Sequence, residues 1–519
     1  MKIATARLVS KTLQWFTLFH NTLSCFCQWS RTKLYSFLRV LLLRLDPFWR
    51  QLFYFVSLFM LGYFVLAILE PRNSINPPER YDLLFTAVSA VTVSSMSTVE
   101  MEVFSNTQLF CLAILMLLGG EVFTSILELQ IQKLKLSVKK ESWVKSASLP
   151  SSNTNLEGGT NPLNRDIDLK YNSMKFLGVI VVTYFVTVQV SGFLLVSLYV
   201  GLVTSAKEVL TNKKLNIQVF SIVTTISTFT NCGFLPTNES MMVFKKNLGL
   251  LVILIPLGLL GNTLYPVFLR LALLLFRKIS SREELKYVLD NEAEFGYHHL
   301  LSGVHCWYLA LTSIGFIVIQ FVLLISIEWK SQALAGLNHL EKVVGSLFQV
   351  VNTRHAGESV FDLSLISPAI IVLIVTMMYL PAYTYFLPRE DKHLPLTVNA
   401  CIKEQKRSSI GFLLLSPLPI LVIIIMLICI IESDNMQKDP LNFSVLNIIF
   451  EVISAYGNVG FSLGYSCKRR LETHGECKDS WYGFAGRWSN ISKLVLVLAM
   501  IFGRLRKFHK RGGKAWKLS

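Results

Sequence analysis

The sequence predicts an all-α polytopic membrane protein, in which eight transmembrane helices form four membrane–pore-helix–membrane repeats around one central pore. Two observations lead to this fold class. The chain of 519 residues is 52% hydrophobic and only 16% charged, whereas soluble globular proteins are about 25% charged. Four times, a long apolar stretch is followed by a short segment, a polar tract and a second apolar stretch. Polar backbone at membrane depth is stable only where it is buried in protein or lines a water-filled path, so the repetition indicates one pore with four linings.

Eight apolar stretches are the predicted spans. Most of them approach the ~20 residues that a helix needs to cross the hydrocarbon core. The last is short and needs snorkelling side chains or shelter from its neighbours. The stretches are 51–70, 108–128, 176–203, 248–276, 304–327, 365–387, 410–431 and 491–503.

A short segment, too brief to cross the membrane, precedes each polar tract. We expect each segment to be a pore helix that enters the membrane and returns, with its C-terminal dipole directed at a cation near the pore centre. The alternative, four hydrophilic loops between ordinary spans, does not explain the repetition. The segments are 82–91, 217–229, 341–351 and 442–456.

The same pattern divides the chain into nine segments. Residues 131–172 include many Ser, Asn and Gly residues without periodicity, which predicts a flexible cytosolic linker. The N-terminal segment is basic and amphipathic, as in helices that lie on a membrane surface. The predicted pore units are 51–130, 173–277, 299–388 and 409–508. They are flanked by the N-terminal segment 1–50, the linkers 131–172, 278–298 and 389–408, and the basic tail 509–519.

The net charge of +17 is explained by its placement. With eight spans and a cytosolic N-terminus, the internal segments hold about twice as many Lys and Arg residues as the external ones, as the positive-inside rule expects. Both termini are therefore predicted to be cytosolic. A basic face toward anionic lipid accounts for the charge, so the predicted partner is the lipid bilayer and no nucleic acid is expected.

Other classes of function lack their sequence signals. The chain has no Gly-x-x-x-x-Gly-Lys-Ser/Thr tract for a nucleotide and no His-Glu-x-x-His metal motif. The linkers are too short for a catalytic domain, so we expect neither an enzyme nor a cofactor. A membrane scaffold or receptor would leave the four polar tracts without a purpose.

At these tracts the sequence resembles the plant HKT transporters of the Trk/Ktr/HKT superfamily of alkali-cation transporters. The resemblance runs from about residue 50 to 519 and covers all four units. It is carried by VSSMSTVEMEVFSN (93–106), TNCGFLPTN (230–238), NTRHAGE (352–358), GNVGF (457–461) and FAGRW (484–488).

The resemblance implies a selectivity filter that takes one residue from each unit, with Na⁺ bound transiently. By position these residues are Ser95, Gly233, Gly357 and Gly460. We align Ser95 with the filter glycines and expect the Ser94 side chain to face away from the axis. The flanking residues are Val93, Ser94, Asn231, Cys232, His355, Ala356, Asn458 and Val459.

In the family, serine in the first unit marks the mostly Na⁺-selective class, and glycine marks members that also carry K⁺. The resemblance therefore implies a plasma-membrane transporter that moves Na⁺ passively, for Na⁺ uptake or retrieval in a plant. A K⁺-permeable or Na⁺/K⁺-coupled transporter of the same fold is the alternative. The superfamily is commonly dimeric, which makes a homodimer the expected assembly.

Three further residues are candidates for the pore mouth or gate, and two cysteines are candidates for a disulfide. Glu358 directly follows the third filter glycine and is expected at the pore mouth, where acidic groups concentrate cations. Pro381 interrupts the sixth span and is a candidate gate, and Arg504 follows the last span and is a candidate to reach the pore. Cys467 and Cys477 lie ten residues apart in an external segment, where a disulfide or two free thiols are the alternatives.

Overall fold

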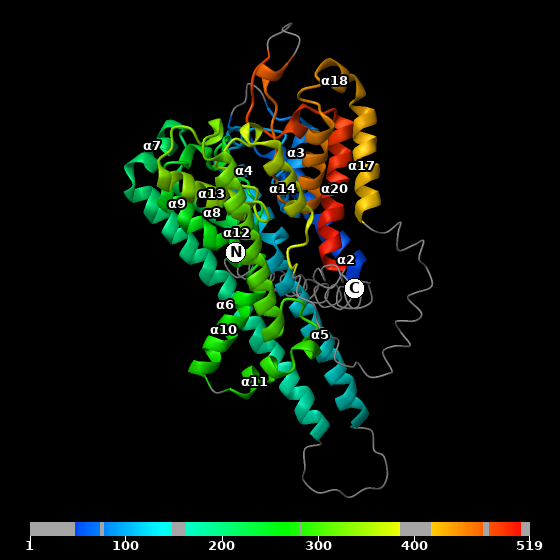
Figure 1. Ribbon diagram of the computed structural model, residues 1–519. Coiled ribbons are helices and arrows are strands. Elements are labelled where there is room, and N and C mark those ends of the chain that lie inside the picture. Colours follow the sequence, from blue (N-terminus) through cyan, green and yellow to red (C-terminus); the bar gives the residue numbers. More distant parts are fainter. Residues whose placement is uncertain are drawn as a thin grey trace, which may run out of the picture.

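The computed structural model describes residues 47–72, 77–147, 162–280, 282–384, 417–470 and 477–509. These residues form α-helices and short 3-10 helices, and none of them lies in a strand. Most of the predicted N-terminal segment, the linker 389–408 and nearly all of the C-terminal tail lie outside the described residues. The helices follow the predicted order of span, pore helix and span (Figure 1).

The first unit consists of α2 (Pro47–Ile68), the pore helix α3 (Arg80–Thr92), α4 (Asn106–Gly119) and α5 (Glu121–Ala147). Helix α4 begins at a capping box, in which Ser105 and Gln108 satisfy each other's free backbone N–H groups. Helices α4 and α5 form one apolar path that bends by 51° at Gly120.

The second unit repeats this arrangement. The long α6 (Pro162–Leu202) is followed by α7 (Thr204–Asn212), the pore helix α8 (Ile217–Thr230), α9 (Leu248–Gly261) and α10 (Tyr265–Ile279). Helices α9 and α10 meet at 85°. The second span is thus broken below the pore helix in both of the first two units.

The third unit comprises α12 (Gly303–Glu328), the pore helix α13 (His339–Asn352) and α14 (Pro368–Tyr379). The fourth comprises α17 (Pro417–Ile431), α18 (Ser433–Lys438), the pore helix α19 (Val445–Gly457) and α20 (Asn490–His509). The short α11 (Glu283–Asp290) connects the second unit to the third.

In the third and fourth units a glutamate joins the end of the first span to the start of the second. Glu328 at the end of α12 accepts a hydrogen bond from the Ser367 N–H at the start of α14. Glu432, just after α17, accepts from both the N–H and the hydroxyl of Ser489 at the start of α20. Each carboxylate satisfies a free N–H at a helix start and joins the two spans of its unit.

The number of spans depends on how the broken helices are counted. Within the described residues, three helices are long and apolar enough to cross a membrane, and five if each bent pair is one span. The other predicted spans coincide with shorter helices (α14 and α17) and with α20, so the count of eight stays a prediction. The outward faces of α6 and α12 carry exposed Leu, Ile, Val and Trp side chains, as lipid-facing helices do.

The flexible linker predicted over 131–172 is wrong at both ends. Helix α5 continues to Ala147 and α6 begins at Pro162, so only 148–161 lie outside the described residues. Surface ion pairs connect the extensions to their neighbours, at 2.7 Å between Lys140 and Asp168 and 3.0 Å between Lys170 and Glu294. Figure 1 shows these extensions and α11 at the end of the molecule opposite α7 and α18.

Candidate functional site

Three of the four pore helices end in the same turn. The residue after each helix has a left-handed backbone, with φ of 53° at Val93, 58° at Asn231 and 51° at Asn458. The next N–H then returns to a carbonyl five residues earlier, 2.9 Å from Ser94 to Ser89 and 3.1 Å from Val459 to Ser454. This 6→1 bond is the Schellman cap, and it turns the chain sharply toward the pore axis.

The pore helix of the third unit ends in a different, longer turn. Thr353 after α13 keeps a right-handed helical backbone, and the Gly357 N–H returns to Asn352 at 3.2 Å. His355 is buried and its Nδ1 contacts the Val351 carbonyl. The longer turn matches the extra residues of the tract Thr353–Gly357 relative to the others.

The four aligned residues meet in what we call the central ring: Ser95, Gly233, Gly357 and Gly460. All four have positive φ, of 53°, 86°, 63° and 98° respectively. A Cβ added at Gly460 would lie 2.1 Å from the Ser95 Cβ, and one at Gly233 would lie 2.8 Å from the Ser95 Oγ. A Cβ at Gly357 would lie 2.2 Å from the Val459 carbonyl oxygen. The ring is thus closed, with Ser95 as its single side chain.

The residues just before the ring are buried in the surrounding wall. Ser94, Cys232, Ala356 and Val459 are at most 2% exposed. The Ser94 hydroxyl lies 2.8 Å from the Asn458 amide nitrogen. The adjacent serines Ser94 and Ser95 therefore have different surroundings, one in the wall and one in the ring.

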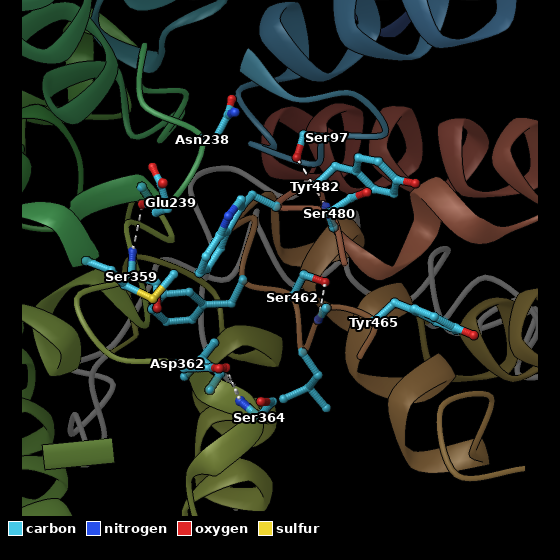
Figure 2. A pocket seen from close by; sticks show the side chains of 18 of the residues that line it. Ser97, Asn238, Glu239, Ser359, Asp362, Ser364, Ser462, Tyr465, Ser480 and Tyr482 are labelled. Atoms are coloured by element: carbon cyan, nitrogen blue, oxygen red, sulfur yellow. Dashed lines mark hydrogen bonds between the residues drawn. The ribbon is translucent and has the colours of Figure 1, made fainter. Parts of the chain in front are cut away.

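A cavity of about 570 Å³ lies against the ring and is lined by all four of its members. Figure 2 shows hydroxyl and carboxylate groups around it, among them Ser97, Glu239, Asp362 and Ser462. Such a polar cavity can hold hydrated cations beside a narrow ring.

Charged residues at the cavity rim join the first two units. Lys213 lies 2.6 Å from both Glu102 and Glu239. Burial lowers the pKa of Lys213, but the hydrogen bonds and charges of Glu102 and Glu239 outweigh it and raise the pKa above its usual value. The ammonium thus stays charged and offsets the two carboxylates. Sequence reasoning missed these two ion pairs because Lys213 is far from Glu102 in the chain.

Glu358 does not lie at the mouth, so that prediction is wrong. Its side chain is fully buried and accepts a hydrogen bond from the Thr228 hydroxyl at 2.7 Å. The carboxylate joins the third turn to the end of α8 from behind the ring. Sequence position next to Gly357 gave no indication of which way the side chain points.

Two buried arginines contact the chain where second-span helices end. Arg504 on α20 donates to the Gly119 carbonyl at the bend of the first unit. Arg354, beside the third turn, donates to the Pro381 carbonyl at 2.6 Å, just after α14. Cations at helix C-termini satisfy free carbonyls and complement the helix dipole. Pro381 therefore belongs to irregular backbone at the end of a second span, and Arg504, within α20, contacts the bend of another.

Glycines let three second-span helices approach the pore turns, a contact that sequence reasoning did not connect with the ring. A Cβ at Gly119, Gly261 or Gly503 would lie 2.0, 1.7 or 1.9 Å from a carbonyl oxygen of Val91, Phe229 or Tyr456. Each of these carbonyls belongs to the residue four positions before a ring member. Aligning the four repeats through their second spans would have revealed the signal.

The segment of the fourth unit that we predict to be external contains a disulfide between Cys467 and Cys477. Its neighbour Arg469 donates to the Ser364 carbonyl of the third unit at 2.9 Å. The covalent bridge thus constrains a segment that borders the cavity.

Comparison with known proteins agrees with this architecture. The model of the TrkH family, described as a cation transport protein, matches residues 73–384 and 413–509. The sodium transporter HKT1 of Arabidopsis thaliana is 47% identical over 463 residues, which cover 87% of this chain and 91% of that protein. The cation transporter HKT1;3 of Oryza sativa subsp. japonica is 44% identical over 489 residues, which cover 91% and 92%.

Among solved structures, the potassium transporter TrkH from Vibrio parahaemolyticus matches with a TM-score of 0.50 at 14% identity. The match covers 89% of this chain and 83% of TrkH, and shows a shared fold. The relatives are ion transporters, which confirms that the chain is not an enzyme. This chain belongs to the TrkH family of cation transport proteins and, within it, to the plant HKT transporters.

Proposed function

We propose that this cation transporter moves Na⁺ passively across the plasma membrane through a selectivity filter formed by the central ring. One observation carries the proposal: four separate pore-helix turns bring one residue each, all with positive φ, to one place beside a polar cavity. Filter oxygens replace part of an ion's hydration shell, and a left-handed backbone without side chains can direct carbonyl oxygens inward.

The proposed preference for Na⁺ depends on Ser95. Its Cβ and hydroxyl are the only side-chain atoms in the ring, and they make it narrower and less symmetric. The physical argument leaves the sign of selectivity open, and the HKT resemblance supplies it. A relative at 47% identity carries the name sodium transporter.

A K⁺-permeable or Na⁺/K⁺-coupled transporter is the second candidate. Its support is the name of the solved neighbour, a potassium transporter, and a pore in which the other three ring members are glycines.

The cellular role that we propose is Na⁺ uptake or retrieval in a plant, by a homodimer with cytosolic termini. Arg504 and the segment at Pro381 are proposed to form the inner constriction.

Voltage clamp of cells that express the full chain tests the proposal. We expect inward current in external Na⁺ and a large negative shift of the reversal potential when K⁺ replaces Na⁺. Equal currents and an unchanged reversal potential in the two cations would favour the second candidate. Absence of any cation current from protein at the cell surface would reject both.

A further inference from the structure

We infer that a hydrogen bond between Asn458 and Ser94 helps to set the Na⁺/K⁺ discrimination of the ring. The inference rests on the proposed function and goes beyond it, because neither residue is a member of the ring. Both are positioning residues that act through their neighbours Ser95 and Gly460.

The bond joins elements that are far apart in the chain. The Asn458 amide nitrogen donates to the Ser94 hydroxyl at 2.8 Å and lies 3.1 Å from the Met500 carbonyl on α20. The Ser94 hydroxyl also pairs with the Thr92 hydroxyl at 2.7 Å. Asn458 and Ser94 are 3% and 0% exposed. One amide thus holds the first pore turn, the fourth pore turn and α20 together, out of reach of competing water.

This bond lies beside the place where the first and fourth turns approach each other in the ring. Ser94 precedes Ser95, and Asn458 is two residues before Gly460. A Cβ at Gly460 would lie 2.1 Å from the Ser95 Cβ and 2.7 Å from the Ser94 carbonyl oxygen. The spacing between the first and fourth turns therefore decides how closely Ser95 approaches its neighbour. Loss of the bond allows these turns to separate and widens the ring where the serine narrows it.

The chain provides its own control in Asn231. This residue occupies the same position in the second unit, with φ of 58° against 51° at Asn458, and it is 2% exposed. Both asparagines suit the left-handed turn. Neither the nitrogen nor the oxygen of the Asn231 amide has a hydrogen-bond partner among the described residues. Both asparagines therefore occupy the left-handed position of their turns, but of the two only Asn458 also forms a hydrogen bond to a neighbouring turn.

The experiment compares Asn458→Gly with Asn231→Gly, Ser94→Ala and the double variant Ser94→Ala/Asn458→Gly. Glycine preserves the left-handed turn at both sites, and alanine at 94 removes a single oxygen. Currents are normalised to surface protein, and the K⁺/Na⁺ permeability ratio is taken from reversal potentials. We expect Asn458→Gly and Ser94→Ala each to raise the ratio by roughly threefold or more, and the double variant to add little, because both changes remove one interaction. Asn231→Gly should leave the ratio nearly unchanged.

The ratio separates the bridge from a general structural role, since misfolding lowers current without changing selectivity. Unchanged ratios in Ser94→Ala and Asn458→Gly, or an equal rise in Asn231→Gly, would overturn the inference. Fully additive effects in the double variant would overturn it as well. The proposed function fails by a different result, namely a wild-type chain that does not discriminate Na⁺ from K⁺, so the two failures are distinguishable.

Discussion

Ser95 combines a strained backbone with the single side chain of the central ring. It holds φ of +53°, a conformation that costs a residue with a Cβ roughly 1–2 kcal/mol. Ser95→Gly should relieve this strain, widen the ring and let K⁺ permeate measurably, whereas Ser95→Ala keeps the Cβ and should remain closer to the wild type. The reversal potential under exchange of Na⁺ for K⁺ measures both. An unchanged ratio in Ser95→Gly would place the origin of Na⁺ preference elsewhere.

Gly460 offers a test of crowding that is separate from backbone strain. Both Gly460 and Gly464 have positive φ, of 98° and 63°. A Cβ at Gly460 would meet Ser95 at 2.1 Å, whereas one at Gly464 has nothing within 4 Å. Gly460→Ala should therefore abolish most Na⁺ current at normal surface expression, and Gly464→Ala should keep it. Similar currents in the two variants would remove Gly460 from the filter.

The sequence supports the alignment of ring residues better than the direction of individual side chains. The repeated tract predicts that Ser95, Gly233, Gly357 and Gly460 are equivalent, because each lies in a polar tract that follows a short helix; the spacing is the same in three units and longer in the third. It cannot predict that Glu358 turns into the wall or that Lys213 lies between Glu102 and Glu239. Those contacts depend on how the four units are placed around the axis, which local pattern does not encode.

At the scale of elements, α20 approaches α19 closely because Gly503 has no side chain. A Cβ at Gly503 would lie 1.9 Å from the Tyr456 carbonyl oxygen, and such overpacking costs about 1–3 kcal/mol. Gly503→Ala should lower the thermal unfolding temperature of the detergent-purified protein and reduce current. Gly315→Ala on α12, with nothing within 4 Å, is the matched control and should be neutral or slightly stabilising. Equal melting of the two variants would contradict the proposed role of this contact.

A buried ion pair fixes the start of the first pore helix to α20. Lys493 lies 2.8 Å from Asp82, and both residues are below 9% exposed. Lys493→Met leaves a buried carboxylate without its partner, which costs about 3–5 kcal/mol. We expect poor yield and early unfolding of this variant, and recovery of much of the loss in Asp82→Asn/Lys493→Met. A double variant no more stable than Lys493→Met would show that the pair does not act as a unit.

Apolar periodicity predicts the elements well where they cross the membrane and less well beyond it. The pore helices α3, α8, α13 and α19 begin and end within three residues of the predicted segments. The polar composition of 131–172 concealed the extensions of α5 and α6, whose Lys140 and Lys170 contact residues distant in sequence. A count of spans by the length of apolar stretches treats each second span as one helix. In the first two units this stretch is divided into two helices, at Gly120 and at Asn262.

Across the whole molecule, the charge distribution and the fold imply the same orientation. The basic segments that we predict to be internal include the extensions of α5 and α6 and the connection through α11, and these lie at one end of the molecule. Helices α7 and α18 and the segment that carries the disulfide lie at the other (Figure 1). An excess of Lys and Arg marks the cytosolic side, and a disulfide forms in an oxidising compartment.

An epitope tag inserted after Ser480 should therefore be labelled in intact cells, whereas a tag at the N-terminus should be labelled only after permeabilisation. A tag inserted at Ser280, before α11, is the internal control and should behave like the N-terminal tag. Labelling of the N-terminal tag or the Ser280 tag in intact cells would reverse the proposed orientation and place the polar cavity beside the ring on the cytosolic side.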